Sequence, residues 1–327
     1  MTQDTKNTAV GGEPGGAPPI LEVKGLCKHF TMGSGRKKRI NKAVDNVSFA
    51  MITGETFGLV GETGCGKTTT GRTIIRLYEP TSGEVFLKGK PIVGKLDGKD
   101  RKFVTTNIQM IFQDPISSLN PRMTVRDIIA EGLVINKMCE SKQELLDKVY
   151  EMLEIVGLSR DHATRYPHEF SGGQRQRIGV ARALITKPSI LIADEPISAL
   201  DVSIQAQVLN LINNLKKKLG LTVLFIAHDL SVVKYISNRI GVMYGGRLVE
   251  LGNSNEIYTN PIHPYTRSLL SAIPLPDPNY ERHRKRIRYD PGMHDYSAEQ
   301  PKFVELLPKH FVLGSSAEIE KYRQELK

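Results

Sequence analysis

The sequence has few cysteines and no long apolar run, and each shortage excludes a class of protein. Its three cysteines, Cys27, Cys65 and Cys139, are too few for a disulfide framework and follow no zinc-binding spacing, so we expect a reducing compartment. No stretch approaches the ~18 consecutive apolar residues that a transmembrane helix needs. The first residues also lack the apolar segment of a secretory signal peptide. We therefore expect a protein that does not cross a membrane by itself.

Acidic residues are also in short supply. The chain has 35 Asp and Glu against 45 Lys and Arg, which gives a formal net charge of +10. Such an excess of positive charge favours binding of nucleic acid, anionic lipid or phosphate ligands, but the charge alone does not show which of these the protein binds. A hydrophobic fraction of 39% over 327 residues is too high for a disordered chain, and it predicts one large globular domain with an appendage, or two domains.

Composition and periodicity divide the chain into three parts. Residues 1–19 are rich in glycine and proline, which predicts a flexible tail. Residues 20–259 alternate strand-like and helix-like segments, the pattern of an α/β fold with a mainly parallel sheet. Within them, residues of about 114–187 are helical in pattern and predict an inserted helical subdomain. Prolines interrupt the pattern after 260, so residues 260–327 are expected to form a C-terminal extension with little core of its own.

One glycine-rich segment predicts a phosphate-binding loop. It fits G-x-x-x-x-G-K-[ST] and stands between a predicted strand and a predicted helix, the context that the motif requires. Its backbone amides and the helix N-terminus would hold phosphates, the lysine would reach the β- and γ-phosphates, and the threonine hydroxyl would bind Mg²⁺. The alternative is a glycine-rich turn without a ligand. The expected ATP-binding residues are Gly61, Glu62, Thr63, Gly64, Cys65, Gly66, Lys67, Thr68 and Thr69.

A second segment supplies two carboxylates. Residues 189–196 read SILIADEP, a buried strand that ends in Asp194 and Glu195. Adjacent carboxylates at a strand end are costly unless a cation lies nearby, so we expect Asp194 to bind Mg²⁺ and Glu195 to orient or deprotonate the attacking water. A solvated acidic turn is the alternative reading.

A third segment suggests that two nucleotide-binding chains act together. Ser171, Gly172, Gly173 and Gln174 open a predicted helix, and such a terminus favours anions. One nucleotide does not need two anion-binding helix termini on the same chain. In a head-to-tail dimer, each Ser171 loop would cap the γ-phosphate that the partner's Lys67 loop holds. The alternative is a plain turn with a capped helix.

These motifs together resemble the ATP-binding subunits of ABC transporters. The similarity covers about residues 21–259 and includes, in the family's order, a Q-loop glutamine at Gln113, a D-loop ending in Asp201 and a switch histidine at His228. It implies an α/β P-loop ABC ATPase domain with a mainly parallel sheet, an antiparallel β subdomain and an inserted helical subdomain. One departure is Phe170, directly before the Ser-Gly-Gly-Gln signature, where the family usually has leucine.

The resemblance also implies a role for each of these side chains. Gln113 would contact Mg²⁺ or water, and His228 would bond the γ-phosphate and help to organise the water that Glu195 activates. Asp201 would tune the dimer interface. The family's adenine-stacking aromatic lies upstream of the phosphate loop, which makes Phe30 the best candidate, although this position equally suits a core residue of a strand.

Two further stretches narrow the subfamily. Residues 112–125 read FQDPISSLNPRMTV and residues 260–278 read NPIHPYTRSLLSAIPLPDP, and both resemble the peptide-importer branch. The tail from residue 280 is similar to the second ATP-binding subunit of Gram-positive oligopeptide permeases. Many relatives in this branch hold an iron–sulfur cluster in a C-terminal cysteine group. This chain has no cysteine after Cys139, so we expect no such cluster.

The resemblance implies an ATPase that uses ATP and Mg²⁺ to energise oligopeptide import from the cytoplasmic face of the cell membrane, as a peripheral subunit. Its partners would be a second, related ABC ATPase subunit in a heterodimer, two transmembrane permease subunits and an extracellular peptide-binding receptor, with no nucleic acid. Two alternatives stay open: the same role for dipeptides, nickel or another solute, and a soluble ABC ATPase outside transport. The basic run at 282–288 is expected to be a solvated surface near an anionic membrane.

Overall fold

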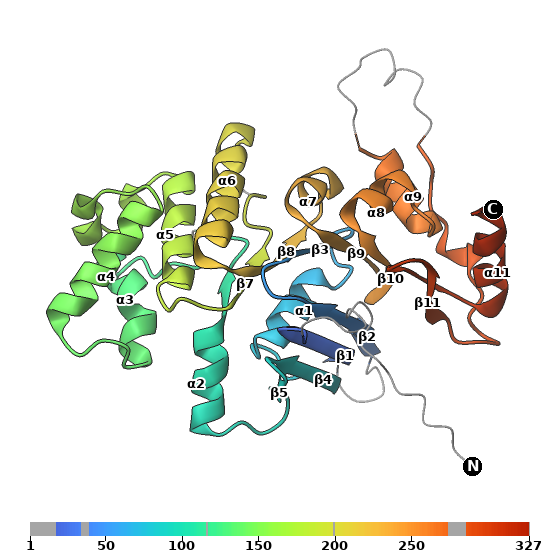
Figure 1. Cartoon of the computed structure of the whole chain (residues 1–327), viewed down its shortest axis with the longest axis horizontal. Helices are drawn as coiled ribbons and strands as arrows, with labels where there is room; N and C mark the ends of the chain where they lie inside the picture. The colour runs from blue at the N-terminus through green and yellow to red at the C-terminus, as the bar shows by residue number, and fades with distance from the viewer. Residues whose placement is uncertain (1–17, 34–38, 116, 199, 274–285, 327) are drawn as a thin grey trace.

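The computed structural model describes residues 18–33, 39–115, 117–198, 200–273 and 286–326 (Figure 1). The flexible tail expected for residues 1–19 therefore lies almost entirely outside the described residues. The same holds for most of the basic run, of which only residues 286–288 are described.

A sheet of eight strands forms the centre of the molecule, in the order β11-β12-β10-β9-β3-β8-β7-β6. Five neighbouring strands run parallel, which confirms the predicted fold class: β9 (Arg239–Tyr244), β3 (Thr56–Val60), β8 (Thr222–Ala227), β7 (Ile190–Asp194) and β6 (Ile108–Ile111). Three antiparallel strands extend one edge: β10 (Arg247–Asn253), β12 (His310–Gly314) and β11 (Lys302–Leu307).

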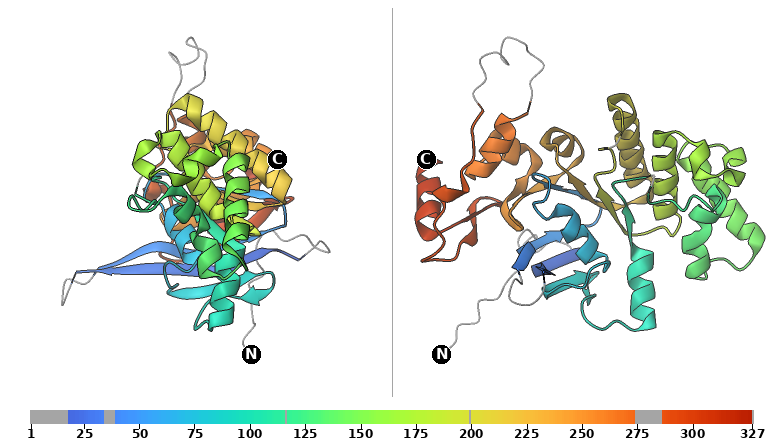
Figure 2. Two further views of the ribbon diagram at one scale, coloured as in Figure 1. Left: turned by 90° about the vertical axis from the view of Figure 1, so that its left-hand side faces the viewer. Right: turned by 180° about the vertical axis from the view of Figure 1, so that it is seen from behind.

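A second, antiparallel sheet lies on one face of the central one (Figure 2). Its order is β2 (Arg39–Met51), β1 (Leu21–Met32), β4 (Ser82–Leu87) and β5 (Lys90–Pro91). The alternation of side chains along β7 explains the layering. Ile190 and Ile192 belong to the core shared with the antiparallel sheet, whereas Leu191 and Ala193 belong to the core on the helical face. Because both faces are covered, the central strands are mostly apolar, with polar residues chiefly at their ends.

Helices complete the two layers. The helix after the phosphate loop, α1 (Lys67–Ile74), contacts strands of both sheets. The helical subdomain stands apart from the antiparallel sheet in Figure 1 and contains α3 (Val125–Ile135), α4 (Lys142–Ile155), the 3₁₀ turns η2 (Arg160–Thr164) and η3 (Pro167–Glu169), and α5 (Gly172–Leu184). The remaining helices of the ATPase region are α2 (Gly98–Asn107), α6 (Val202–Leu219), α7 (Leu230–Ile236) and α8 (Ser254–Thr259).

The C-terminal region joins the central sheet. We expect residues 260–327 to have little core of their own, and Ile262, Val312, Ile319 and Tyr322 form a small apolar cluster to which α11 (Ser316–Glu325) contributes. The other elements of this region are α9 (Pro264–Ser271) and the turn η4 (Pro291–Met293). In addition, β12 pairs with β10 and so extends the central sheet, a contact that the composition of the region does not reveal.

Hydrogen bonds to the carboxylate of Glu250 join the C-terminal region to the central sheet. Glu250 is fully buried on β10 and accepts hydrogen bonds from the backbone N–H groups of Ile262 and His263, at 2.8 and 3.0 Å. The Nε2 atom of His310 on β12 lies 2.7 Å from the same carboxylate. A buried carboxylate with three such partners stabilises the junction of β10, β12 and the start of α9.

Candidate nucleotide-binding site

Four neighbouring parallel strands deliver the predicted site residues to one edge of the sheet. β3 ends at the phosphate loop, β7 ends at Asp194, β8 ends directly before His228, and β6 ends two residues before Gln113. Because parallel strands end on the same side, side chains that are far apart in sequence meet there, the place where open α/β sheets bind ligands.

The phosphate loop is held in an ordered turn. The Lys67 ammonium donates to the carbonyl oxygens of Gly61, at 2.7 Å, and Glu62, at 3.0 Å, and its side chain is buried. Gly66 has φ 108°, and a Cβ there would lie 2.1 Å from the carbonyl oxygen of Ala43. Only glycine fits this position. The loop thus presents the first-turn amides of α1, which have no intrahelical acceptor, beside a lysine charge.

Cys65 is a buried loop residue. A thiol at a helix N-terminus often has a lowered pKa. Here burial raises the pKa of Cys65, and this effect outweighs the nearby Lys67 charge. The thiol is therefore a small packing group of the loop, with little thiolate character.

The side chains of Thr68 and Asp194 are hydrogen-bonded to each other at the end of β7. The Thr68 hydroxyl donates to Oδ1 of Asp194 at 2.8 Å. The carboxyl is fully buried, and Oδ2 has no hydrogen-bond partner among the residues that the structure describes. The nearest guanidinium nitrogen, on Arg72, lies 4.0 Å away. Burial raises the pKa of Asp194 above its usual value. An unpartnered oxygen of this kind, beside a threonine hydroxyl, fits Mg²⁺, which prefers oxygen ligands.

Two side chains, Gln113 and His228, converge on one carboxylate oxygen of Glu195. The Gln113 amide nitrogen donates to Oε2 of Glu195 at 2.9 Å, and Nδ1 of His228 lies 3.3 Å from the same atom. The backbone of Glu195 is left-handed, with φ 45°, which costs a non-glycine residue about 1–2 kcal/mol. Its N–H donates to the carbonyl of Ile226 on β8 at 2.9 Å, and this bond helps to hold the turn. The result is a preorganised carboxylate beside the Thr68–Asp194 pair.

The signature segment is ordered but lies away from this cluster. Ser171 caps α5 by accepting from the Gln174 N–H at 3.4 Å, and the Gln174 side chain accepts from the Ser171 N–H at 3.1 Å. Ser171 and Gly172 are exposed. In Figure 1, α5 belongs to the helical subdomain, whereas α1 lies against the two sheets. No hydrogen bond joins Ser171–Gln174 to the phosphate loop within the described ranges. Asp201, at the start of α6, is likewise exposed.

Phe30 lies on β1 and is half-buried, outside the fully buried core. Its ring meets that of Tyr78 edge to face, with centroids 5.4 Å apart. The Lys28 ammonium lies 5.0 Å from the Phe30 centroid and 5.9 Å from the Tyr78 centroid. Tyr78 is not among the residues predicted for the site. Its position shortly after α1 is the only feature of the sequence that suggests that it lies near Phe30.

Tyr265 is a second site residue that sequence reasoning missed. Its hydroxyl accepts a hydrogen bond from the Glu62 backbone N–H at 3.0 Å, across 203 positions of sequence. Tyr265 is 1% exposed and packs against the rings of Tyr244 and Tyr289, at centroid distances of 4.5 and 5.2 Å. The C-terminal region thus touches the phosphate loop directly. In the sequence, the segment that contains Tyr265 indicates only the subfamily and gives no sign of this contact.

Comparisons with known families agree with this geometry. The family described as "ABC transporter" matches residues 44–198, and the family described as "Oligopeptide/dipeptide transporter, C-terminal region" matches residues 249–298. None of the described helices is long and apolar enough to span a bilayer.

Solved structures share the fold. The ATP-binding cassette MJ0796, in a dimeric post-hydrolysis state bound to ADP and Pi, is 28% identical with a TM-score of 0.65, and the match covers 72% of this chain and 99% of that one. CbiO1 of Clostridium perfringens, part of the ABC transporter complex cbiONQ, is 26% identical with a TM-score of 0.63, over 74% of this chain and 91% of that one.

Curated relatives match almost the whole chain. The oligopeptide transport ATP-binding protein OppF of Bacillus subtilis is 60% identical over 93% of this chain and 98% of its own length. AmiF of Streptococcus pneumoniae, an oligopeptide transport ATP-binding protein, is 51% identical over 94% and 98%. DppF of Lactococcus lactis, a dipeptide transport ATP-binding protein, is 54% identical over 93% and 97%. The phosphate loop, the paired carboxylates and these matches lead to one conclusion: the chain belongs to the ATP-binding proteins of the ABC transporter family, in the branch that carries the oligopeptide/dipeptide C-terminal region.

Proposed function

We propose that this ATPase energises the import of oligopeptides as the peripheral subunit of a membrane transporter, at the cytoplasmic face. The observation that carries the ATPase mechanism is the convergence of Gln113 and His228 on Glu195, beside the Thr68–Asp194 pair. The oligopeptide cargo rests on the relatives whose names state it, which match the chain through its C-terminal region.

In this mechanism the chain binds and orients ATP before it assists hydrolysis. The Lys67 ammonium exchanges its bonds to the loop carbonyls for β- and γ-phosphate oxygens. The amides of the α1 N-terminus point at the same phosphates. Phe30, with Tyr78 at its edge, offers the aromatic surface for the adenine ring. Both ends of the nucleotide are then held by groups that are ordered beforehand.

Glu195 acts on the attacking water. Its carboxylate accepts the water's hydrogen, while Gln113 and His228 keep Oε2 at one position. His228 is 54% exposed at its side chain, so it is free to reach the γ-phosphate as well. Mg²⁺, when bound by Thr68 and Asp194, would neutralise phosphate charge. These side chains thus supply the water-activating half of the site, and the loop supplies the phosphate-binding half.

The signature segment acts on a partner's nucleotide. The segment Ser171–Gln174 is exposed at Ser171 and Gly172, is ordered by its own cap, and has no bond to this chain's phosphate loop within the described part, which suits contact with a second ATPase subunit. We propose a heterodimer with a related ABC ATPase, in which Asp201 lies at the interface. Two transmembrane permease subunits and an extracellular peptide-binding receptor would complete the transporter. Closure of the dimer excludes bulk water from the γ-phosphate but keeps the one water that faces Glu195, and hydrolysis reopens the dimer.

The experiment measures uptake in cells whose only copy of this chain carries Glu195→Gln. Labelled peptides of two to eight residues and nickel are offered separately. We expect loss of uptake of the longer peptides, with ATP binding by the purified variant preserved. The matched control is Glu154→Gln, the same chemical change at a carboxyl that is 53% exposed on α4. It should transport normally.

Other outcomes would change the proposal in different ways. Loss confined to dipeptides or nickel would keep the import role and replace the cargo, in line with the dipeptide transport relative from Lactococcus lactis. Normal uptake of every solute, in a variant that no longer hydrolyses ATP, would refute the transport role. Normal hydrolysis by Glu195→Gln would refute the assignment of Glu195.

A further inference from the structure

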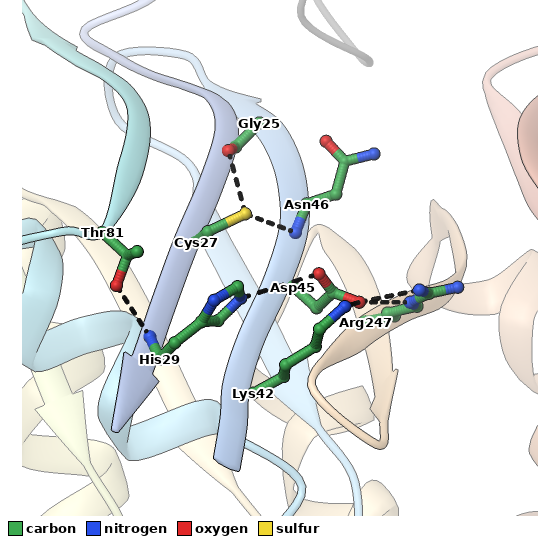
Figure 3. Close-up of polar contacts among 8 residues, drawn as sticks. All are labelled: Gly25, Cys27, His29, Lys42, Asp45, Asn46, Thr81 and Arg247. Carbon is green, nitrogen blue, oxygen red and sulfur yellow. Dashed lines mark hydrogen bonds and ion pairs between the residues drawn. The ribbon is translucent and has the colours of Figure 1, made fainter. Parts of the chain in front are cut away.

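A cluster of three metal-binding side chains lies outside the nucleotide site. Cys27 and His29 on β1 and Asp45 on β2 offer one ligand atom each, and these atoms lie within 4.8 Å of one another (Figure 3). Cys27 and His29 are two positions apart on one strand, which places them on the same face. We propose that this thiol–imidazole–carboxylate cluster is a binding site for a Zn²⁺-class transition-metal ion.

An irregularity in the strand pairing turns Asp45 toward the other two residues. Leu26 pairs with Val47 and Lys28 with Val44, so β2 contains an extra residue opposite β1. Asn46, next to Asp45, has the left-handed φ of 58°. Such bulges commonly redirect a side chain. Here the bulge brings a carboxylate from β2 beside the two ligands on β1.

Each of the three ligand atoms can still coordinate a metal ion. The Nε2 atom of His29 is shielded from solvent and has no hydrogen-bond partner among the described residues, and it lies 3.8 Å from Oδ1 of Asp45. The guanidinium of Arg247 donates two hydrogen bonds to the Asp45 carboxylate, and both fall on Oδ2, at 2.7 and 2.9 Å, which leaves Oδ1 facing His29. The Cys27 sulfur accepts from the Asn46 N–H at 3.2 Å and donates its S–H to the Gly25 carbonyl at 3.6 Å, so a metal ion would take the place of that proton.

The spacing fits a tetrahedral ion after a small adjustment. Zinc ligands at about 2.0–2.3 Å place the ligand atoms about 3.3–3.8 Å apart. The His29–Asp45 distance of 3.8 Å already meets this value, and Cys27 needs a rotation or shift of up to about 1 Å. A solvent water completes the coordination. Thiolate, imidazole and carboxylate together favour Zn²⁺ over Mg²⁺ or Ca²⁺.

The charges around the cluster allow such an ion. Zn²⁺ displaces the proton of the Cys27 thiol, so the thiolate and the Asp45 carboxylate together balance its charge. Arg247 stays bonded to Oδ2 as an outer partner that orients the carboxylate. The Lys42 ammonium, on a side chain that is 57% exposed, also pairs with Oδ2, at 3.8 Å, and so leaves Oδ1 to the ion (Figure 3).

The test is metal binding by the full-length purified protein, after chelator treatment and dialysis. We expect one Zn²⁺ per chain in competition with a chromophoric chelator, and a thiolate charge-transfer band when Co²⁺ replaces Zn²⁺. Cys27→Ser should lose the band and weaken Zn²⁺ binding at least about tenfold, the smallest loss typical of even an outer-shell change. The matched control is Cys139→Ser, a half-buried thiol on another part of the chain, which should keep both.

A second variant distinguishes loss of a metal ligand from misfolding of Cys27→Ser. His29→Gln keeps Cys27 and should also weaken Zn²⁺ binding, with unchanged far-ultraviolet circular dichroism. Zn²⁺ should raise the thermal unfolding temperature of the wild type and of Cys139→Ser, but not of Cys27→Ser. Zn²⁺ affinities that are equal in the wild type and in Cys27→Ser would overturn the proposal. So would a Co²⁺ complex of the wild type without a thiolate band.

Discussion

Replacing Tyr265 with phenylalanine is expected to weaken ATP binding without disturbing the core. The change removes only the hydroxyl that accepts the Glu62 backbone N–H at 3.0 Å. The ring stays packed between Tyr244 and Tyr289 at a site that is 1% exposed. Because the phosphate loop binds ATP through its backbone amides, a loop that loses one anchor must be reordered when the nucleotide binds.

The size of the effect follows from the bond that is lost. A neutral hydrogen bond contributes about 0.5–1.5 kcal/mol net. If ATP binding restores the loop, this cost appears as an increase of about 2- to 12-fold in the dissociation constant. The Lys67 bonds to Gly61 and Glu62 remain in the variant and keep the effect within this range.

The assay is calorimetric titration with a non-hydrolysable ATP analogue. Tyr289→Phe is the matched control, because it removes a hydroxyl from the same aromatic cluster, and no hydrogen bond of Tyr289 to the phosphate loop occurs among the described residues. Equal dissociation constants for the wild type, Tyr265→Phe and Tyr289→Phe would refute the idea that the C-terminal region positions the loop. Equal weakening in both variants would attribute the effect to the cluster as a whole.

Three further predictions test the remaining groups. Lys67→Ala should weaken ATP binding on the order of tenfold or more, since it removes a charge-assisted phosphate contact, and an unchanged dissociation constant would remove Lys67 from this role. His228→Ala should lower the hydrolysis rate on the order of 100-fold at nearly constant ATP affinity, measured by steady-state phosphate release; a rate near that of the wild type would mean that Glu195 needs no support from His228. Asp45 has a folded pKa below its unfolded value of 3.8, so its stabilising contribution is present above that value and is lost as the pH falls through the folded pKa. Chemical unfolding between about pH 6 and about pH 3 should therefore show a smaller loss of stability for Asp45→Asn than for the wild type, and equal losses would contradict the assignment.

Much of the nucleotide site was predictable because each motif is local. The phosphate loop, Glu195 and His228 each follow a strand directly, and Asp194 is the last residue of one, and a strand that ends in polar residues is visible in the sequence. The sequence does not show that these residues lie close together in the fold. Gln113 and His228 reach the same oxygen of Glu195 because β6, β7 and β8 are neighbours in the sheet, an order that no local pattern encodes.

The contacts of the C-terminal region could not be predicted from the sequence. The proline-rich composition predicts an extension with little core of its own, and its subfamily motif identifies relatives but not contacts. In the structure, β12 gains its partners from β10, and Tyr265 reaches the Glu62 amide across 203 positions. Contacts of this kind depend on which strand edge is free and on which surface is already buried, and both are properties of the folded chain.

The sequence by itself determined the type of chemistry of this protein: a glycine-rich loop with a lysine binds phosphates, and paired carboxylates at a strand end suit a cation and a water. Those properties are local because backbone conformation and functional groups lie within a few residues of one another. Only the tertiary structure decided that one carboxylate oxygen of Glu195 has two partners and that the C-terminal region holds the phosphate loop through Tyr265. It also decided that Cys27, His29 and Asp45 share a face. These arrangements arise from strand order, a bulge and long-range packing, which place distant residues within hydrogen-bond or ligand distance.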